Sequence, residues 1–172
     1  MIELLRTRRS IRKYTEQKIE QEKLEILKEA VLRSPSSKGI NPWRFIFIDD
    51  LETIQKLKVC KPTGTGPLET APLAVVFCAD ETVNDAWIED CSIAAIILQL
   101  TAHSLGLGSC WIHAHYRMYN EKISSEKYIQ DLLGIPAQFK VLCAVSVGYP
   151  AKPAIGRPFE ELQFEKIRIN RY

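Results

Sequence analysis

The sequence lacks the cysteine pattern of a disulfide framework or a zinc site. Its five cysteines are widely scattered, and no two of them have C-x-x-C spacing. The number is odd, and several of these cysteines stand in apolar runs, as buried free thiols do. Unpaired cysteines indicate a reducing compartment. Because the chain has only three histidines, His103, His113 and His115, a metal site is not expected.

Long apolar runs and a strong charge of one sign are also missing. The unbroken apolar runs, among them Ile93 to Leu98 near the middle of the chain, are far too short to span a bilayer. The N-terminus has no basic leader followed by an apolar stretch. The formal net charge is +2, and neither half of the chain is strongly biased. We therefore expect a cytoplasmic protein that binds neither a membrane nor nucleic acid.

Several common catalytic and nucleotide-binding motifs are absent as well. There is no G-x-G-x-x-G after a strand, no Walker-type loop, no G-x-S-x-G and no paired-carboxylate motif. If the chain is an enzyme, its reactive group is therefore expected to be a bound cofactor rather than a side chain.

The hydrophobic patterns that are present predict an α+β fold. The 172 residues suffice for one domain with its own core, spanning residues 1–172. Periodicity predicts helices at 1–7, 20–33, 51–59, 85–105 and after Ser124, and strands at 43–48, 73–79, 109–112 and 141–147. We expect a small, mostly antiparallel sheet surrounded by helices. The helix at 85–105 is apolar on nearly all sides, so a central position plus a subunit interface would cover it.

The first candidate site is a basic segment directly after the first helix. Five basic residues and no acid lie between Arg6 and Lys13. In an extended chain Arg8, Ser10 and Arg12 point to the same side, where two guanidinium groups and a hydroxyl suit a phosphate. Spacing alone favours a solvated basic surface. A nucleic-acid contact is a further alternative, although no aromatic residues interleave with the arginines.

Two further segments combine small residues with backbone groups that a ligand could reach. The loop from Pro35 to Gly39 leads into the predicted strand at 43–48. Gly106 and Gly108 precede Trp111-Ile112-His113 and let a strand begin immediately after the long helix. Each segment is adequately explained as a connection between a helix and a strand.

In this order, these segments resemble the nitroreductase family of FMN-dependent flavoproteins over essentially the whole chain. The R-x-S-x-R of residues 8–12 is similar to the family's phosphate-binding signature. The Pro-Ser-Ser loop that runs into Pro42-Trp43 is similar to its second motif. Other segments are similar to a short subclass: Trp87-Ile88-Glu89-Asp90, Leu105 to Ile112, Gly148-Tyr149-Pro150, Arg157-Pro158 and Asn170-Arg171-Tyr172. Their joint order and spacing are much more specific than any one piece.

The resemblance implies a nitroreductase-like fold in an intertwined homodimer with FMN at the interface. One subunit would bind the cofactor through Arg8, Arg9, Ser10, Arg12, Trp111, Ile112, His113 and Arg157. The other would contribute Pro35, Ser36, Ser37 and Gly39. Because the flavin carries the chemistry, no side chain is assigned a catalytic role.

The sequence departs from the family pattern in the flavin-contacting segments. Gly39 and Asn41 stand where the family often has Asn and Gln, and His113-Ala114 where it often has Glu-Gly. A residue of Thr63-Gly64-Thr65 replaces the usual flavin-contacting Asn. The chain is also short, so we expect the helical insertion over the substrate site to be reduced or missing.

The expected function is that of an FMN-dependent NAD(P)H oxidoreductase. By a ping-pong mechanism it would pass hydride from NAD(P)H through flavin N5 to a nitroaromatic, quinone or flavin-like acceptor. Two alternatives stay open. One is a non-catalytic flavin-binding or redox-sensing module, and the other is a reductive dehalogenase or flavin-modifying enzyme of the same fold.

Overall fold

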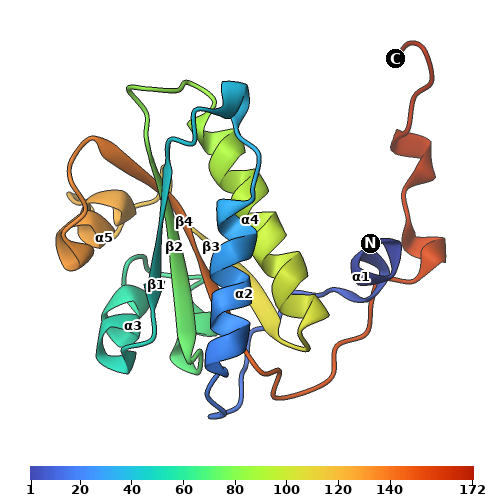
Figure 1. Cartoon of the computed structure of the whole chain (residues 1–172), viewed down its shortest axis with the longest axis horizontal. Helices are drawn as coiled ribbons and strands as arrows, with labels where there is room; N and C mark the ends of the chain where they lie inside the picture. The colour runs from blue at the N-terminus through green and yellow to red at the C-terminus, as the bar shows by residue number, and fades with distance from the viewer.

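The computed structural model describes all residues from 1 to 172 and is built around a four-stranded antiparallel sheet (Figure 1). The strands are β1 (Trp43–Ile48), β2 (Leu73–Asp80), β3 (Gly108–His113) and β4 (Phe139–Gly148). Their order is β1-β2-β4-β3, and every neighbouring pair is antiparallel. The edge strands β1 and β3 each have one side that no other strand of the sheet covers.

Helices cover both faces of the sheet (Figure 1). Helices α2 (Gln21–Leu32) and α4 (Trp87–Ser104) lie on one face, and α3 (Leu51–Lys58) and α5 (Ser125–Leu133) on the other. Side chains of β2 alternate between the two faces, so Val75 and Phe77 join the core under α2 and α4 while Val76 and Cys78 join the core under α3 and α5. Since both faces are covered, β2 is buried almost throughout.

The predicted helices and strands are confirmed, with small shifts at their ends. Helix α4 begins at Trp87, two residues later than predicted, because Asn84 Oδ1 accepts the Ala86 N–H and holds the chain in a turn. The end of α4 is as expected, with Gly106 in the left-handed region at φ 77°. Ser124 caps α5, since its hydroxyl accepts the Lys127 N–H at 3.1 Å.

Helix α4 is central to the molecule but not fully covered by its own chain. Ile93 and Ile96 are each 38% exposed, and Ile97 and Leu100 are half-buried. These positions recur at i, i+3, i+4 and i+7, so they form one stripe along the helix. The described chain leaves this apolar stripe open. No helix, α4 included, combines the length and the apolar character that a membrane crossing requires.

The N-terminal helix and the C-terminal segment lie beside the sheet rather than on it (Figure 1). Helix α1 (Ile2–Thr7) meets the end of α4, where Thr7 Oγ1 and His103 Nε2 are 2.8 Å apart. Residues 151–172 extend away from the sheet, with short 3₁₀ turns at Phe159–Glu161 and Phe164–Lys166. This segment exposes large apolar side chains, among them Ile155, Phe159, Ile167, Ile169 and Tyr172.

Candidate functional site

The segment from Arg8 to Arg12 leaves α1 in an extended conformation and lies along the free edge of β3. Arg8 has φ −62° and ψ 133°. Ser10 forms a parallel bridge with Ser109, and the Ile11 N–H donates to the Ser109 carbonyl at 2.9 Å. The extended conformation required for Arg8, Ser10 and Arg12 to share one side is therefore present.

Cys110 of β3 is sensitive to the charge along this edge. Burial raises the pKa of the Cys110 thiol, and Arg12, Ser10, Arg8 and Lys61 act in the opposite direction. Donor groups from two distant parts of the sequence therefore act on one buried sulfur. The spacing of R-x-S-x-R predicted three of them, whereas Lys61 was not expected.

The arginines at this edge are not neutralised by carboxylates of the chain. The ion pairs of the molecule involve other side chains throughout, so Arg8, Arg9 and Arg12 have no acidic partner. Guanidinium groups without acidic partners beside a serine hydroxyl make a site rich in hydrogen-bond donors. Such a site fits the phosphate group of FMN.

Strand β3 adds backbone donors to this edge. In an antiparallel sheet, alternate residues of an edge strand direct both backbone groups away from the neighbouring strand. The Ser109 and His113 carbonyls face outwards, because they accept the Ile11 N–H at 2.9 Å and Lys61 Nζ at 2.8 Å. The N–H groups of Trp111 and His113 share that orientation. This geometry is compatible with the expected flavin contact of Trp111-Ile112-His113.

Trp111, Ile112 and His113 differ in what their side chains can offer. The rings of Trp111 and His113 are half-buried and nearly parallel, with centroids 6.2 Å apart. The Ile112 side chain is 1% exposed and belongs to the core under α3 and α5. The backbone groups of Ile112 face β4, so a ligand at the edge of β3 meets Trp111 and His113, and Ile112 supports their position from the core.

Gly108 allows the phosphate-binding segment to lie close to β3. A Cβ atom at position 108 would come within 2.5 Å of Ile11 Cγ1. Ile11 stands between Ser10 and Arg12, so its position decides where both neighbours lie. Of the two glycines in this turn, Gly106 ends α4 and Gly108 makes room for Ile11.

Tyr14 anchors the far end of the same segment. Its buried hydroxyl donates to the Ile11 carbonyl at 2.7 Å and lies 2.8 Å from Ser146 Oγ. Burial raises the pKa of Tyr14 well above its usual value, which keeps the hydroxyl protonated. This anchor was missed in the sequence, because it depends on β4 lying beneath residue 14.

The loop from Pro35 to Gly39 lies at the opposite end of α4. The Ser37 N–H donates to Asp90 Oδ1 at 2.8 Å, and Asn84 Nδ2 donates to Asp90 Oδ2 at 2.6 Å. Asp90 is 2% exposed and ties the loop to the first turn of the helix. With a rise of about 1.5 Å per residue, this tether is about 20 Å along the helix from His103, which contacts Thr7 of α1. One chain therefore does not bring Pro35, Ser36, Ser37 and Gly39 to its own arginine cluster.

Arg157 begins the exposed C-terminal segment. The preceding Gly156 packs against α1, since a Cβ atom there would lie 1.8 Å from the Arg6 carbonyl oxygen. Arg157 Nε is 3.9 Å from Glu161 Oε2, and both side chains are more than half exposed. Arg157 thus follows a residue that lies against the start of the phosphate-binding segment, but it contacts a carboxylate rather than that segment.

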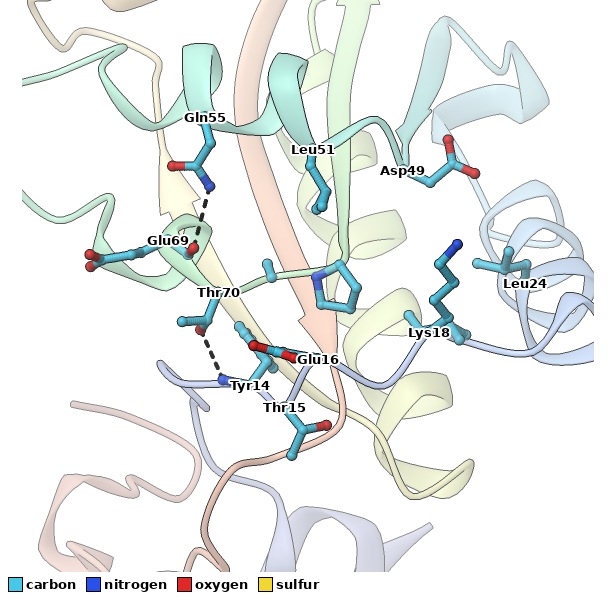
Figure 2. Close-up of a pocket in the computed structure, with 13 residues that line it drawn as sticks. Tyr14, Thr15, Glu16, Lys18, Leu24, Asp49, Leu51, Gln55, Glu69 and Thr70 are labelled. Atoms are coloured by element: carbon cyan, nitrogen blue, oxygen red, sulfur yellow. Dashed lines mark hydrogen bonds between the residues drawn. The ribbon is translucent and has the colours of Figure 1, made fainter.

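A large hollow of the chain lies away from the arginine cluster. It has a volume of about 680 Å³ and is situated beside Tyr14, between residues 15–19, the start of α3 and the start of β2. Figure 2 shows its charged rim, with Lys18 and Asp49 on one side and Glu69 on the other. None of the predicted cofactor-binding residues lines it. Nor does the chain contain a group of three His, Cys, Asp or Glu side chains that could hold a metal ion.

Comparison with known proteins agrees with the fold and with the order of these segments. The family model described as the nitroreductase family matches residues 5–59 and 65–149. A solved structure of an FMN-dependent nitroreductase from Clostridium difficile R20291 is 45% identical, covers 100% of both chains and superposes with a TM-score of 0.97.

Two curated relatives are similar over most of the chain. A protein of Archaeoglobus fulgidus, provisionally named NADH dehydrogenase/NAD(P)H nitroreductase, is 36% identical over 87% of this chain and 84% of its own length. An FMN reductase [NAD(P)H] of Bacillus subtilis is 30% identical over 92% of this chain and 69% of its own. The chain therefore belongs to the nitroreductase family.

Proposed function

We propose that the chain is an FMN-dependent oxidoreductase that uses NADH or NADPH to reduce a nitroaromatic, quinone or flavin-like acceptor by a ping-pong mechanism. The observation that carries this proposal is the donor-rich edge of β3, where arginines without acidic partners and Ser10 lie beside outward-facing N–H groups. The names of two similar proteins, an FMN-dependent nitroreductase and an FMN reductase [NAD(P)H], support it.

Different residues of this edge would bind different parts of the cofactor. Arg8, Ser10 and Arg12 would hold the phosphate, with Arg9 and Arg157 beside them. Each charge-assisted hydrogen bond to such an anion contributes about 1.5–3 kcal/mol. Trp111, Ile112 and His113 would lie against the isoalloxazine ring. When bound, FMN supplies the two-electron chemistry, accepting hydride from the nicotinamide and donating it to the acceptor.

A homodimer would complete this site. Pro35, Ser36, Ser37 and Gly39 lie at the first turn of α4, whereas the phosphate-binding segment follows α1, which meets the other end of that helix. These four residues would therefore serve the cofactor of the other subunit. The open apolar stripe of α4 and the apolar side chains of residues 151–172 support this proposal, because both need a cover that their own chain does not supply. The five buried, unpaired thiols fit a reducing compartment such as the cytoplasm.

The test is to purify the protein, release its flavin and measure the ratio of FMN to chain together with the mass in solution. We expect a yellow dimer with one FMN per chain. Parallel double-reciprocal plots for NAD(P)H and menadione would indicate the ping-pong order. A colourless monomer that does not bind added FMN would contradict the proposal, and a yellow dimer with negligible turnover would point to a flavin-binding module instead.

A further inference from the structure

A second group of basic side chains lies at the far end of β3 from the phosphate-binding segment. It consists of Lys61, His113 and Arg117, which we call the rim cluster. Lys61 follows α3, His113 ends β3, and Arg117 stands in the turn after β3. None of the three takes part in an ion pair of the chain.

The contacts of the rim cluster leave its charges available. Lys61 Nζ donates to the His113 carbonyl at 2.8 Å, which places the ammonium group at the free edge of β3. The backbone of Arg117 is held on both sides, by the Ala114 carbonyl at 3.0 Å and the Ser125 N–H at 2.8 Å. Its guanidinium has one weak contact, to the Tyr116 carbonyl at 3.5 Å. Arg117 is therefore fixed in place while its charged end remains free.

The three groups act on one another as like charges. Burial lowers the pKa of His113, and the charges of Arg117, Lys61 and His115 lower it further. Burial also lowers the pKa of Lys61, with a further contribution from Arg117. The acid that opposes this, Glu126, forms no ion pair with the rim cluster: its Oε1 is 2.9 Å from His115 Nδ1 and accepts the Tyr116 N–H at 3.3 Å. The cluster thus keeps a positive charge that the chain does not neutralise.

One member of the rim cluster also borders a shallow hollow on the surface. Lys61 and Tyr119 line this hollow of about 320 Å³, and Tyr119 stacks on Tyr128 with ring centroids 4.4 Å apart. An aromatic ring and a cation of the rim cluster therefore border the same space.

We propose that the rim cluster selects an acceptor that carries a carboxylate or another acidic group, which Arg117 binds together with Lys61. This inference rests on the proposed function, because it concerns the second substrate of the same site. A guanidinium and a carboxylate have matching bidentate geometry. Lys61 is bound to the last residue of β3, so an acidic group held there would orient the ring of the acceptor along the free edge of that strand.

The test compares 4-nitrobenzoate with 4-nitrobenzamide, which have closely similar shapes but differ in charge. Calorimetry without reductant measures their binding to the FMN-loaded dimer, and steady-state assays measure kcat/KM for both. We expect tighter binding of 4-nitrobenzoate, and Arg117→Gln should lower the ratio of kcat/KM for benzoate over benzamide about tenfold. Lys122→Gln, in the same loop and without an ion pair, is the matched control and should keep the wild-type ratio.

Each other outcome has a definite meaning. Equal binding of the two compounds, or an unchanged ratio in Arg117→Gln with full FMN content, would overturn the inference while leaving the reductase intact. If Arg117→Gln instead changes the preference between NADPH and NADH, the cluster binds a donor phosphate and the inference is wrong. Failure of the wild type to reduce either compound or menadione would refute the proposed function, and the calorimetric comparison would still decide whether the rim cluster binds an acid.

Discussion

Substituting Gly106, which ends α4, and Gly108, which begins β3, should separate cofactor binding from folding. In Gly108→Ala the new Cβ atom would lie 2.5 Å from Ile11 Cγ1, 2.7 Å from its Cβ and 2.9 Å from its Cγ2. Carbon atoms prefer a separation of about 3.5–4.0 Å, so Ile11 must withdraw by about 1 Å. Because the clash includes Ile11 Cβ, rotation of the side chain cannot relieve it and the backbone has to move.

The size of the effect follows from the bonds that this shift breaks. The Ile11 N–H donates to the Ser109 carbonyl at 2.9 Å, and a displacement of about 1 Å takes the pair beyond the hydrogen-bonding range. Ser10 and Arg12 flank Ile11 and move with it. Losing one charge-assisted bond to the phosphate costs about 1.5–3 kcal/mol. We therefore expect the Kd for FMN to rise between about tenfold and 150-fold.

Gly106→Ala is the matched control. Gly106 has φ 77°, and a Cβ atom there would meet nothing within 4 Å. The left-handed conformation costs a residue with a side chain about 1–2 kcal/mol, so Tm should fall by about 2–8 °C. The phosphate-binding segment does not contact this position, and the Kd for FMN should stay within about twofold of the wild type.

The assay combines fluorescence titration of apoprotein with FMN and thermal unfolding followed by circular dichroism. The expected pattern is a crossed one, in which Gly108→Ala loses FMN affinity and Gly106→Ala loses stability with FMN affinity retained. A folded Gly108→Ala protein with wild-type FMN affinity would refute the role assigned to Ile11. Equal loss of affinity in both variants would show that the turn acts through stability alone.

Three further outcomes are expected. Arg12→Ala should weaken FMN retention on dialysis by about tenfold to 150-fold. The control Arg33→Ala, which removes an exposed ion pair with Glu29, should retain FMN. Equal retention by both variants would place the phosphate elsewhere. Burial raises the pKa of Cys60 and Cys78 to about 11, so their thiols stay protonated at pH 8. They should react with a disulfide reagent only after unfolding. Fast reaction of the native protein would show that they are accessible. Removing residues 155–172 should shift the protein from dimer to monomer in sedimentation and release FMN, and a stable yellow dimer would show that the segment covers neither interface nor site.

The fold could be predicted because local patterns and packing agree. The aromatic and β-branched run of β1 and the continuous apolar run of β2 indicate strands, and Gly106 and Ser124 mark helix boundaries through their own backbone chemistry. The first residue of α4 was predicted two positions too early. Asn84 holds the preceding residues in a turn, and hydrophobic periodicity does not reveal such a turn. Strand order was not predictable from these patterns, since alternation shows which faces are buried but not which strand lies at the edge.

That missing strand order limited the prediction of the site. The R-x-S-x-R segment became a donor-rich site only when β3 proved to be an edge strand with Ser109 open to Ser10. Lys61 and Cys110 were missed for the same reason, because their relation to Arg12 depends on how β3 meets the loop after α3. Asp90 belongs to the segment Trp87-Ile88-Glu89-Asp90, which resembles the family. Its hydrogen bonds to the Ser37 N–H and to Asn84 could not be predicted, because they depend on the tertiary structure.

Anaerobic reduction of the purified protein tests the proposed reaction most directly. Addition of NADH or NADPH under nitrogen should bleach the visible absorption of the bound flavin. After the nucleotide has been removed under nitrogen, addition of menadione should restore the absorption and yield one reduced acceptor per flavin. Absorption that neither nucleotide bleaches, in protein that carries FMN, would contradict the assignment of this chain as an NAD(P)H-dependent oxidoreductase.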